Sequence, residues 1–217
     1  MKAPGIWPGS PEQGTFIAVS GIDGSSKSTQ VKYIAELLES YGKKVILTRE
    51  PGGTPMAERI RELVLDNVMF IDTTLLLMFA ARNEHVYGLI KPALNRGEWV
   101  VCDRFVECTY GLQGGGWMMG EEKIDVLAKY ILGDFKPDIT FLFDLPVEVA
   151  QERLLNSGKQ QNRLDLESRS FHERTRQMYL SRAAKDPTII VINANQDIES
   201  VRNDIKVQLD KYYNETN

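Results

Sequence analysis

A segment near the N-terminus has the residue types and the spacing of a phosphate-binding loop. An apolar run precedes it and a helical pattern follows it, which is the setting in which backbone N–H groups bind phosphates at a helix N-terminus. In such loops the lysine, here Lys27, reaches the β- and γ-phosphates of a nucleotide, and the next hydroxyl, here Ser28, binds Mg²⁺. The expected nucleotide-binding residues of this segment are Gly21, Ile22, Asp23, Gly24, Ser25, Ser26, Lys27, Ser28 and Thr29.

One residue departs from the pattern of such loops, because Ser26 occupies the position of the second glycine. Glycine there leaves room for the close approach of backbone and phosphate. A serine-rich helix cap is the alternative interpretation, since serine is a good capping residue. We favour the phosphate-binding loop and expect Ser26 to have a negative φ, a conformation in which the backbone tolerates a side chain.

A candidate metal ligand follows another apolar run. Asp103 comes directly after Val100–Cys102, and ligands of open α/β sheets bind beyond the carboxyl ends of the strands. Together with Ser28, Asp103 is therefore expected to hold Mg²⁺ or to order its water shell. A strand-ending aspartate that caps the next turn is the alternative. Asp144 has a similar position after a later run.

Two arginines have positions suited to a second anionic group. Arg49 and Arg104 each follow an expected strand directly, and a guanidinium group can bind phosphate through two parallel hydrogen bonds. Surface ion pairs with the adjacent Glu50 and Asp103 are the alternative. We expect both arginines to bind a substrate phosphate.

A polar segment at about residues 157–164 joins two expected helices. Its glycine and its polarity predict a mobile lid. Arg153, Lys159 and Arg163 could bring positive charge to a phosphoryl group in transfer, where negative charge is spread. An exposed charged loop without a role is the alternative.

The elements that must position these residues alternate along the chain. Continuous apolar runs predict buried parallel strands at Phe16–Val19, Lys44–Leu47, Trp99–Cys102, Ile139–Phe143 and Ile189–Ile192. Helical patterns lie at Ser28–Ser40, Met56–Leu65, Thr74–Asn95, Glu121–Leu132, Val147–Asn156, Leu166–Ala184 and Ile198–Tyr212. This alternation predicts an α/β fold with a doubly wound, parallel, five-stranded sheet flanked by helices.

Composition sets the remaining limits. The 217 residues are 42% hydrophobic and 26% charged, with a net charge of −4, which is ordinary for a folded domain and argues against nucleic-acid binding. No apolar run is long enough to span a membrane, and two cysteines without a secretory leader indicate a reducing cytoplasm. Residues 1–14 hold six prolines and glycines and are expected to form an irregular arm before a single domain at 15–217.

Taken together, these motifs resemble the thymidylate kinase family. The resemblance extends from Phe16 to the C-terminus and is most specific at 48–54, 103–105, 113–116, 163–165, 171–176 and 179–180. It implies a P-loop kinase of the nucleoside monophosphate kinase type, a homodimer that transfers the γ-phosphoryl group of ATP to dTMP with Mg²⁺, giving dTDP and ADP. Gly24 within the loop, where some members have a basic residue, resembles the bacterial arrangement with catalytic arginines in the lid.

The resemblance also implies roles for individual residues. The catalytic residues would be Lys27, Arg104, Arg153, Lys159 and Arg163, and Asn193 would lie beside adenine. The dTMP site would comprise Asp23, Arg49, Pro51, Met78, Phe79, Arg82, Arg104, Thr109 and Gln113. In the family a phenylalanine four residues before the base-binding arginine stacks on thymine. Here Met78 has that position relative to Arg82, so either Met78 replaces the ring or a local irregularity brings Phe79 to the base.

Two other functions compete with this interpretation. The first is a deoxynucleoside monophosphate kinase with another or a broader base preference, which Met78 motivates. The second is a nucleotide-binding module with low turnover, which Ser26 and the arginine-poor lid motivate, although Arg49 and Arg104 argue against it. The apolar first half of helix Thr74–Asn95 is expected to contribute to a dimer interface, with burial inside one subunit as the alternative.

Overall fold

The central feature of the fold is one parallel sheet. The computed structural model describes residues 14–158 and 166–216, and within them the strands pair in the order β2-β3-β1-β4-β5. The strands are β1 (Phe16–Ser20), β2 (Val45–Arg49), β3 (Trp99–Asp103), β4 (Ile139–Asp144) and β5 (Ile189–Asn193). The predicted five-stranded sheet is confirmed. Of the predicted N-terminal arm only Gly14 lies within the described residues, and of the predicted lid only Ser157 and Gly158 do.

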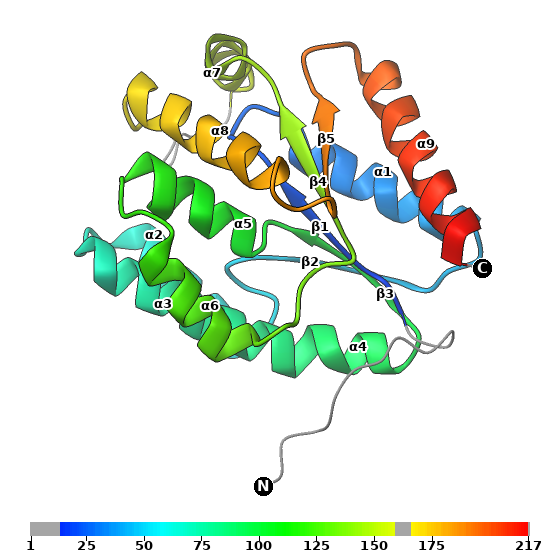
Figure 1. The fold of residues 1–217 in the computed structure, drawn as a ribbon, viewed down its shortest axis with the longest axis horizontal. Helices are drawn as coiled ribbons and strands as arrows, with labels where there is room; N and C mark the ends of the chain where they lie inside the picture. The colour runs from blue at the N-terminus through cyan, green and yellow to red at the C-terminus, as the bar shows by residue number, and fades with distance from the viewer. Residues whose placement is uncertain (1–13, 159–165, 217) are drawn as a thin grey trace, which may run out of the picture.

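Helices cover both faces of this sheet (Figure 1). They are α1 (Lys27–Ser40), α2 (Pro55–Asp66), α3 (Ile71–His85), α4 (Lys91–Asn95), α5 (Val106–Thr109), α6 (Glu122–Leu132), α7 (Val147–Asn156), α8 (Arg169–Ala183) and α9 (Ile198–Thr216), with π-helical segments η1 (Val86–Ile90) and η2 (Tyr110–Gly116). No helix within 14–158 and 166–216 combines the length and hydropathy that crossing a membrane requires.

The alternation of side chains along β1 produces two separate cores. Ile17 and Val19 pack with residues of α1 and α9 on one face, whereas Phe16 and Ala18 pack with residues of α3, α4 and α6 on the other. Successive residues of a strand point to opposite faces, so a continuous apolar run fills both cores. This confirms the doubly wound arrangement.

Three expectations about helices need correction. The helix predicted at Thr74–Asn95 begins at Ile71 and contains the π-helical segment η1 before it continues as α4. The helix predicted from Leu166 begins at Arg169, because the Ser168 side chain accepts a hydrogen bond from the Phe171 N–H at 3.2 Å and caps it there. The helical segment formed by α5 and η2 was not predicted at all.

The glycines of η2 explain why the sequence concealed this helical segment. A Cβ at Gly116 would lie 2.4 Å from the Phe171 ring, and one at Gly115 would lie 2.6 Å from the Met178 side chain. Glycine clusters ordinarily indicate loops, but here the absence of side chains lets α8 approach the helical segment closely. The packing between them overrides the low helix propensity of glycine.

The sheet brings the chemistry-bearing residues together at its carboxyl edge. Arg49, the last residue of β2, pairs in register with Asp103 at the end of β3, and Asp103 is level with Val19 near the end of β1. The loop between β1 and α1 begins immediately beyond that point. Parallel strands therefore place the phosphate-binding loop, Arg49 and Asp103 side by side.

Candidate active site

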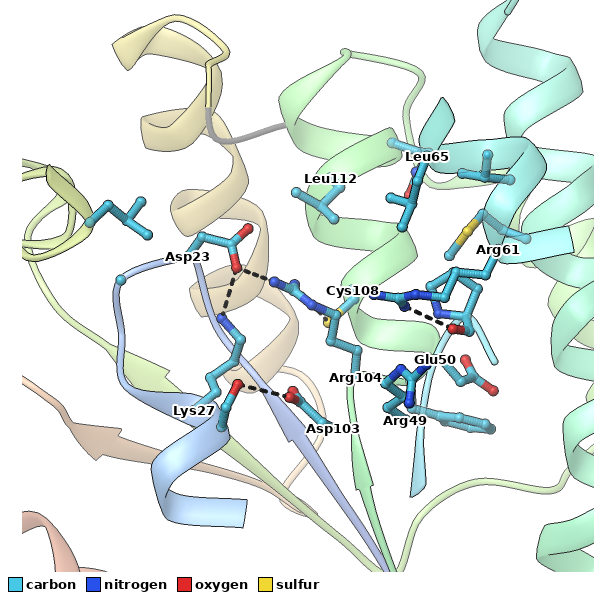
Figure 2. Close-up of a pocket in the computed structure, with 18 of the residues that line it drawn as sticks. Asp23, Lys27, Arg49, Glu50, Arg61, Leu65, Asp103, Arg104, Cys108 and Leu112 are labelled. Atoms are coloured by element: carbon cyan, nitrogen blue, oxygen red, sulfur yellow. Dashed lines mark hydrogen bonds and ion pairs between the residues drawn. The ribbon is translucent and has the colours of Figure 1, made fainter. Parts of the chain in front are cut away.

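A cleft of about 540 Å³ opens at this edge, and most of the predicted site residues line it (Figure 2). Those that line it are Asp23, Gly24, Ser26, Lys27, Ser28, Thr29, Arg49, Pro51, Met78, Arg82, Asp103, Arg104, Gln113 and Arg153. The lining does not include Gly21, Ile22, Ser25, Phe79, Thr109 or Asn193. Lys159 and Arg163 lie outside the described residues. The charged residues of the lining are six cations (Lys27, Arg49, Arg61, Arg82, Arg104 and Arg153) and three anions (Asp23, Glu50 and Asp103), so this part of an acidic protein carries a positive charge.

Lys27 is held by the loop that precedes it. Its Nζ atom donates to the Ile22 carbonyl oxygen at 2.7 Å and lies 3.5 Å from Asp23 Oδ1. Burial and the like charge of Arg104 lower the pKa of Lys27. A buried ammonium that faces a cleft and has a carboxylate beside it is suited to binding a phosphate group.

Gly24 is required by the close contact between the loop and α7. A Cβ at this position would lie 2.2 Å from the Ala150 carbonyl oxygen, and the backbone has φ 84°. A larger residue would therefore displace α7 from the loop. This contact explains why the loop carries no basic side chain at this position.

The expected backbone conformation of Ser26 is wrong. Ser26 has φ 65° and ψ 17°, in the left-handed region, immediately before α1 begins. A residue with a Cβ is strained there, at a cost on the order of 1 kcal/mol. The turn from the loop into α1 imposes a conformation that glycine usually adopts. The Ser26 side chain makes no capping hydrogen bond.

Asp23 connects the phosphate loop to the loop after β3. Its carboxylate accepts a hydrogen bond from Arg104 Nη2 and forms an ion pair with Lys27 (Figure 2). Burial alone would raise the pKa of Asp23, but the positive charges of Arg104 and Lys27 outweigh it and lower the pKa to about 2. Arg104 itself has a left-handed backbone with φ 70°. The pairing places its guanidinium group between the phosphate loop and the β3 end of the cleft.

Ser28 and Asp103 are in contact, as predicted. The Ser28 hydroxyl donates to Asp103 Oδ2 at 3.2 Å, and the other oxygen, Oδ1, is buried without a hydrogen-bond partner in the described chain. A hydroxyl and a carboxylate are oxygen ligands of the kind that Mg²⁺ prefers, and the ion usually keeps waters and phosphates as its other ligands. The described residues contain no cluster of three or more His, Cys, Asp or Glu that could hold a metal ion.

Asp144 has a different partner. Its two carboxylate oxygens accept hydrogen bonds from Arg176 Nε and Nη2 at 2.7 and 2.8 Å. This bidentate pair raises the pKa of Arg176. The strand-end position alone does not tell which of Asp103 and Asp144 is free to bind a metal ion. Their tertiary neighbours distinguish them, because Arg176 binds both carboxylate oxygens of Asp144.

The acceptor side of the cleft has a third arginine that sequence reasoning missed. Arg49 Nη2 donates to Glu58 Oε2 at 2.9 Å, and Arg61, one helical turn after Glu58 on α2, donates to the Pro51 carbonyl oxygen at 2.8 Å. Burial and the like charge of Arg49 lower the pKa of Arg61. The i,i+3 spacing of Glu58 and Arg61 places both side chains on one face of the helix after Pro51. This spacing was the sequence feature from which Arg61 could have been identified.

At the far end of the cleft, Arg82 is buried among polar partners. Its Nε donates to Glu50 Oε2 at 2.8 Å and its Nη2 donates to Thr109 Oγ1 at 3.1 Å. Its third nitrogen, Nη1, is buried without a hydrogen-bond partner among residues 14–158 and 166–216. Thr109, expected to contact a base, is fully buried and contacts Arg82 instead.

The structure decides between Met78 and Phe79. Met78 lines the cleft, whereas Phe79 is 2% exposed in the core and its ring centroid lies 4.9 Å from the Arg82 guanidinium carbon. The helix is regular at these positions, and the π-helical irregularity comes later, at η1. The structure therefore favours Met78 over Phe79 as the residue that faces the cleft.

Gln113 and Arg153 also face the cleft. Gln113 Oε1 is buried and has no hydrogen-bond partner in the part of the chain that is described. Arg153 Nη1 donates to the Ala194 carbonyl oxygen at 2.9 Å, which links α7 to the loop after β5. Asn193, expected beside adenine, uses its side-chain oxygen to accept from the Asn195 N–H at 2.9 Å.

Comparisons with known proteins agree with this geometry. The family model described as "Thymidylate kinase" matches residues 19–205. A thymidylate kinase of Bordetella petrii is 44% identical over 91% of this chain and 95% of its own length. Those of Bordetella pertussis and Pseudomonas fluorescens are 46% and 48% identical over 88% and 87% of this chain, and each match covers 91% of the relative. The chain belongs to the thymidylate kinase family.

Proposed function

We propose that this protein transfers the γ-phosphoryl group of ATP to the 5′-phosphate of dTMP, giving ADP and dTDP. The observation that carries the proposal is the excess of cations over carboxylates in one cleft of a protein with net charge −4. Such a cleft concentrates anions. Its cations form one group at the phosphate loop and another beyond β2 and β3, which suits two phosphorylated substrates that meet end to end.

The donor binds at the phosphate loop. Backbone N–H groups at the start of α1 and the Lys27 ammonium bind the β- and γ-phosphates. Ser28 and Asp103 would hold Mg²⁺, which, when bound, neutralises charge on the phosphates. The unpartnered Asp103 Oδ1 fits this role because a buried carboxylate oxygen needs a compensating contact.

The transfer itself depends on positioning and on positive charge. An oxygen of the acceptor phosphate bonds to the γ-phosphorus while the bond from that phosphorus to the β–γ bridging oxygen breaks, and ADP leaves with the electron pair. Negative charge is spread over the transferred group during this step. Lys27 and Arg104 lie on either side of Asp23 and stabilise that charge, and Arg153 supplies a third cation from α7, with Lys159 and Arg163 proposed to do so from the lid.

The acceptor base binds at the Arg82 end. Arg82 Nη1 is a donor without a partner and Gln113 Oε1 is an acceptor without one, within the described residues, and both residues line the cleft. Thymine offers a carbonyl oxygen and a ring N–H that complement them. Met78 provides the apolar and polarizable contact for the base.

A homodimer forms the second part of the proposal. On and before α3, Phe70 and Val68 are 87% and 89% exposed and Leu76 is 58% exposed. Large apolar side chains exposed to this degree suit an interaction site. We expect sedimentation at micromolar concentration to show a dimer, and a monomer there would contradict it.

One experiment separates the competing functions. ADP formation is measured with ATP, Mg²⁺ and each deoxynucleoside monophosphate in turn. A strong preference for dTMP supports the proposal, and comparable rates with several acceptors indicate the broader kinase that Met78 motivates. ADP formation that no acceptor accelerates would indicate a nucleotide-binding module and would contradict the proposal.

A further inference from the structure

Arg82 is one member of a chain of buried polar groups that joins three elements. Glu50, directly after β2, accepts from Arg82 Nε at 2.8 Å with Oε2, and its other oxygen, Oε1, lies 3.1 Å from His85 Nδ1. His85 Nε2 lies in turn 2.7 Å from the Thr48 hydroxyl of β2. Glu50, Arg82 and His85 are 3%, 1% and 0% exposed. Apart from Arg82 Nη1, each nitrogen and oxygen named here has a partner.

The chemistry of Glu50 fixes the tautomer of His85. An ionised carboxylate only accepts hydrogen bonds, so the proton must be on Nδ1 and His85 donates to Glu50. The Thr48 hydroxyl can either donate to or accept from Nε2, so this contact is kept whether the ring is neutral or charged. A Cβ at Gly53 would lie 2.4 Å from the His85 ring, so the ring has little room to rotate.

These contacts leave the guanidinium group of Arg82 with one orientation. The group is planar, and two of its nitrogens are already bound to Glu50 and Thr109 in that plane. The rings of Phe79 and Phe105 lie 4.9 and 5.4 Å from its central carbon. Nη1 is the one nitrogen of this group without a hydrogen-bond partner among the described residues, and the contact with Glu50 fixes where it points.

We propose that Glu50 and His85 are positioning residues for acceptor recognition: His85 holds the Glu50 carboxylate, which holds Arg82 with Nη1 facing the base of the nucleoside monophosphate. The proposal rests on the proposed function, because it takes Arg82 to contact the acceptor base. Both carboxylate oxygens of Glu50 are already bound, one to Arg82 and one to His85, so we expect neither residue to contact the reacting phosphates. Their effect should therefore fall on acceptor binding and leave the donor site intact.

The test uses side chains that keep or lose one hydrogen bond. His85→Asn retains an N–H donor near the position of Nδ1, whereas His85→Gln places its amide near Nε2 and loses the donor to Glu50. Glu50→Gln keeps the shape of the side chain and removes the charge that pairs with Arg82. Ile90→Ala, in the same helical segment and fully buried, is the control for a loss of stability that does not touch the polar chain.

We expect Glu50→Gln to raise KM for dTMP by about 10- to 100-fold and His85→Gln by about 3- to 10-fold, with kcat and KM for ATP changed little. His85→Asn should restore KM to near the natural value. Calorimetric titration of dTMP should show the same order of affinities, because binding does not require turnover.

Several results would overturn the proposal. The first is that His85→Gln and Ile90→Ala lose the same Tm and have the same KM for dTMP. The role of His85 would then be structural alone. Another is His85→Asn no better than His85→Gln. If the natural protein phosphorylates a different monophosphate better, the same variants are measured with that acceptor. If it neither binds nor phosphorylates any monophosphate, the proposed function fails first, and the inference fails with it.

Discussion

Two regions of this molecule use the same residue types in opposite ways. The cleft at the carboxyl edge of the sheet is lined by six cations and three carboxylates. A second hollow, between α5, α6, β4 and α8, is lined by three cations (Lys129, Lys136 and Arg182) and three carboxylates (Glu107, Asp125 and Asp186). The first region has excess charge and the second is balanced.

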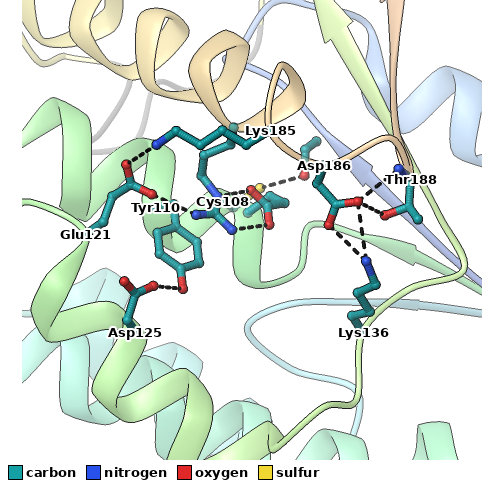
Figure 3. A network of polar contacts seen from close by, with 11 residues as sticks. Cys108, Tyr110, Glu121, Asp125, Lys136, Lys185, Asp186 and Thr188 are labelled. Atoms are coloured by element: carbon teal, nitrogen blue, oxygen red, sulfur yellow. Dashed lines mark hydrogen bonds and ion pairs between the residues drawn. The ribbon is translucent and has the colours of Figure 1, made fainter.

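The second region is a network in which the partners satisfy one another (Figure 3). Arg182 donates to both oxygens of Glu107 and also to Glu121, and its guanidinium carbon lies 3.4 Å from the centre of the Tyr110 ring. The Tyr110 hydroxyl donates to Asp125 at 2.6 Å. None of these side chains has a buried, unpartnered nitrogen or oxygen.

The cleft differs in this respect. Arg82 Nη1, Asp103 Oδ1 and Gln113 Oε1 are buried and lack hydrogen-bond partners among the described residues, and all three residues line the cleft. An unsatisfied buried polar atom destabilises the folded chain. A complete network therefore stabilises the fold, and in the cleft we propose that a bound substrate supplies the missing partners.

The largest expected effect comes from the cation at the centre of the cleft. Lys27→Ala should reduce kcat by about three orders of magnitude, because it removes the charge at the β- and γ-phosphates. Tm should change little in comparison, since the residue serves the ligand. Steady-state kinetics and thermal unfolding check this together, and near-natural turnover would remove Lys27 from the mechanism.

Arg104→Ala should act mainly on the acceptor. Loss of a charge-assisted contact to the acceptor phosphate is expected to lower kcat/KM for dTMP by roughly 30- to 1,000-fold, or about 2–4 kcal/mol. ATP affinity of the free enzyme should change little. A collapse of ATP affinity with unchanged acceptor kinetics would place Arg104 on the other substrate.

Substitution of the central arginine in the second region should lower stability without affecting catalysis. Arg182→Gln leaves the largely buried Glu107 carboxylate without its partner and should lower the free energy of unfolding by about 2–4 kcal/mol. Urea unfolding measures this. Lys129→Ala breaks the exposed pair with Asp134 and is the control, with no measurable loss expected because solvent screens the pair. A large loss of kcat/KM in the folded Arg182→Gln variant would contradict the interpretation that the second region serves stability alone.

The Asp23 carboxylate should make stability depend on acid pH. Its pKa is lowered to about 2 in the folded protein, so the stabilisation is complete above its ordinary pKa and is lost as pH falls toward about 2. The stability advantage of the natural protein over Asp23→Asn should therefore shrink by about 1 kcal/mol between about pH 6 and about pH 3. Urea unfolding across this range measures it, and a constant difference would contradict the assigned pKa.

The smallest effect is expected at Ser26. Since its φ is 65°, Ser26→Gly should relieve strain and raise the free energy of unfolding by about 1 kcal/mol. Removal of the side chain beside the phosphates should also tighten ATP binding by a few-fold, on the order of 1 kcal/mol. Thermal unfolding and titration with ATP measure the two effects. Weaker ATP binding in the variant would indicate that the serine hydroxyl is itself a phosphate ligand.

Local pattern was enough to predict the sheet and the phosphate-binding end of the site. Continuous apolar runs predicted the positions of all five strands, because burial on both faces leaves no place for polar alternation. Lys27, Ser28 and Asp103 followed from motif spacing, because a short loop between a strand and a helix has few possible geometries. Arg49 and Arg104 were found in the same way, from their positions after strands.

Long-range contacts decided the rest. Ser26 is left-handed because the turn into α1 requires it, and no local propensity reveals that strain. The glycines of η2 form a helical segment because α8 packs against them. Thr109 and Phe79 are adjacent in sequence to cleft residues, yet they face the interior, and the side chain of Asn193 binds within its own loop.

The part of the site around Arg82 shows most clearly the difference between what the sequence determines and what the tertiary structure decides. The sequence by itself determined that Arg82 is on a helix with an apolar face, so that its charge needs a partner. That the partner is Glu50, that the other oxygen of Glu50 contacts His85, and that Nη1 has no partner among the described residues depend on buried contacts between α3 and the residue that follows β2. Residues separated by more than thirty positions meet there because parallel strands and their crossover helices bring the carboxyl edge together, and only the folded chain specifies which of them touch.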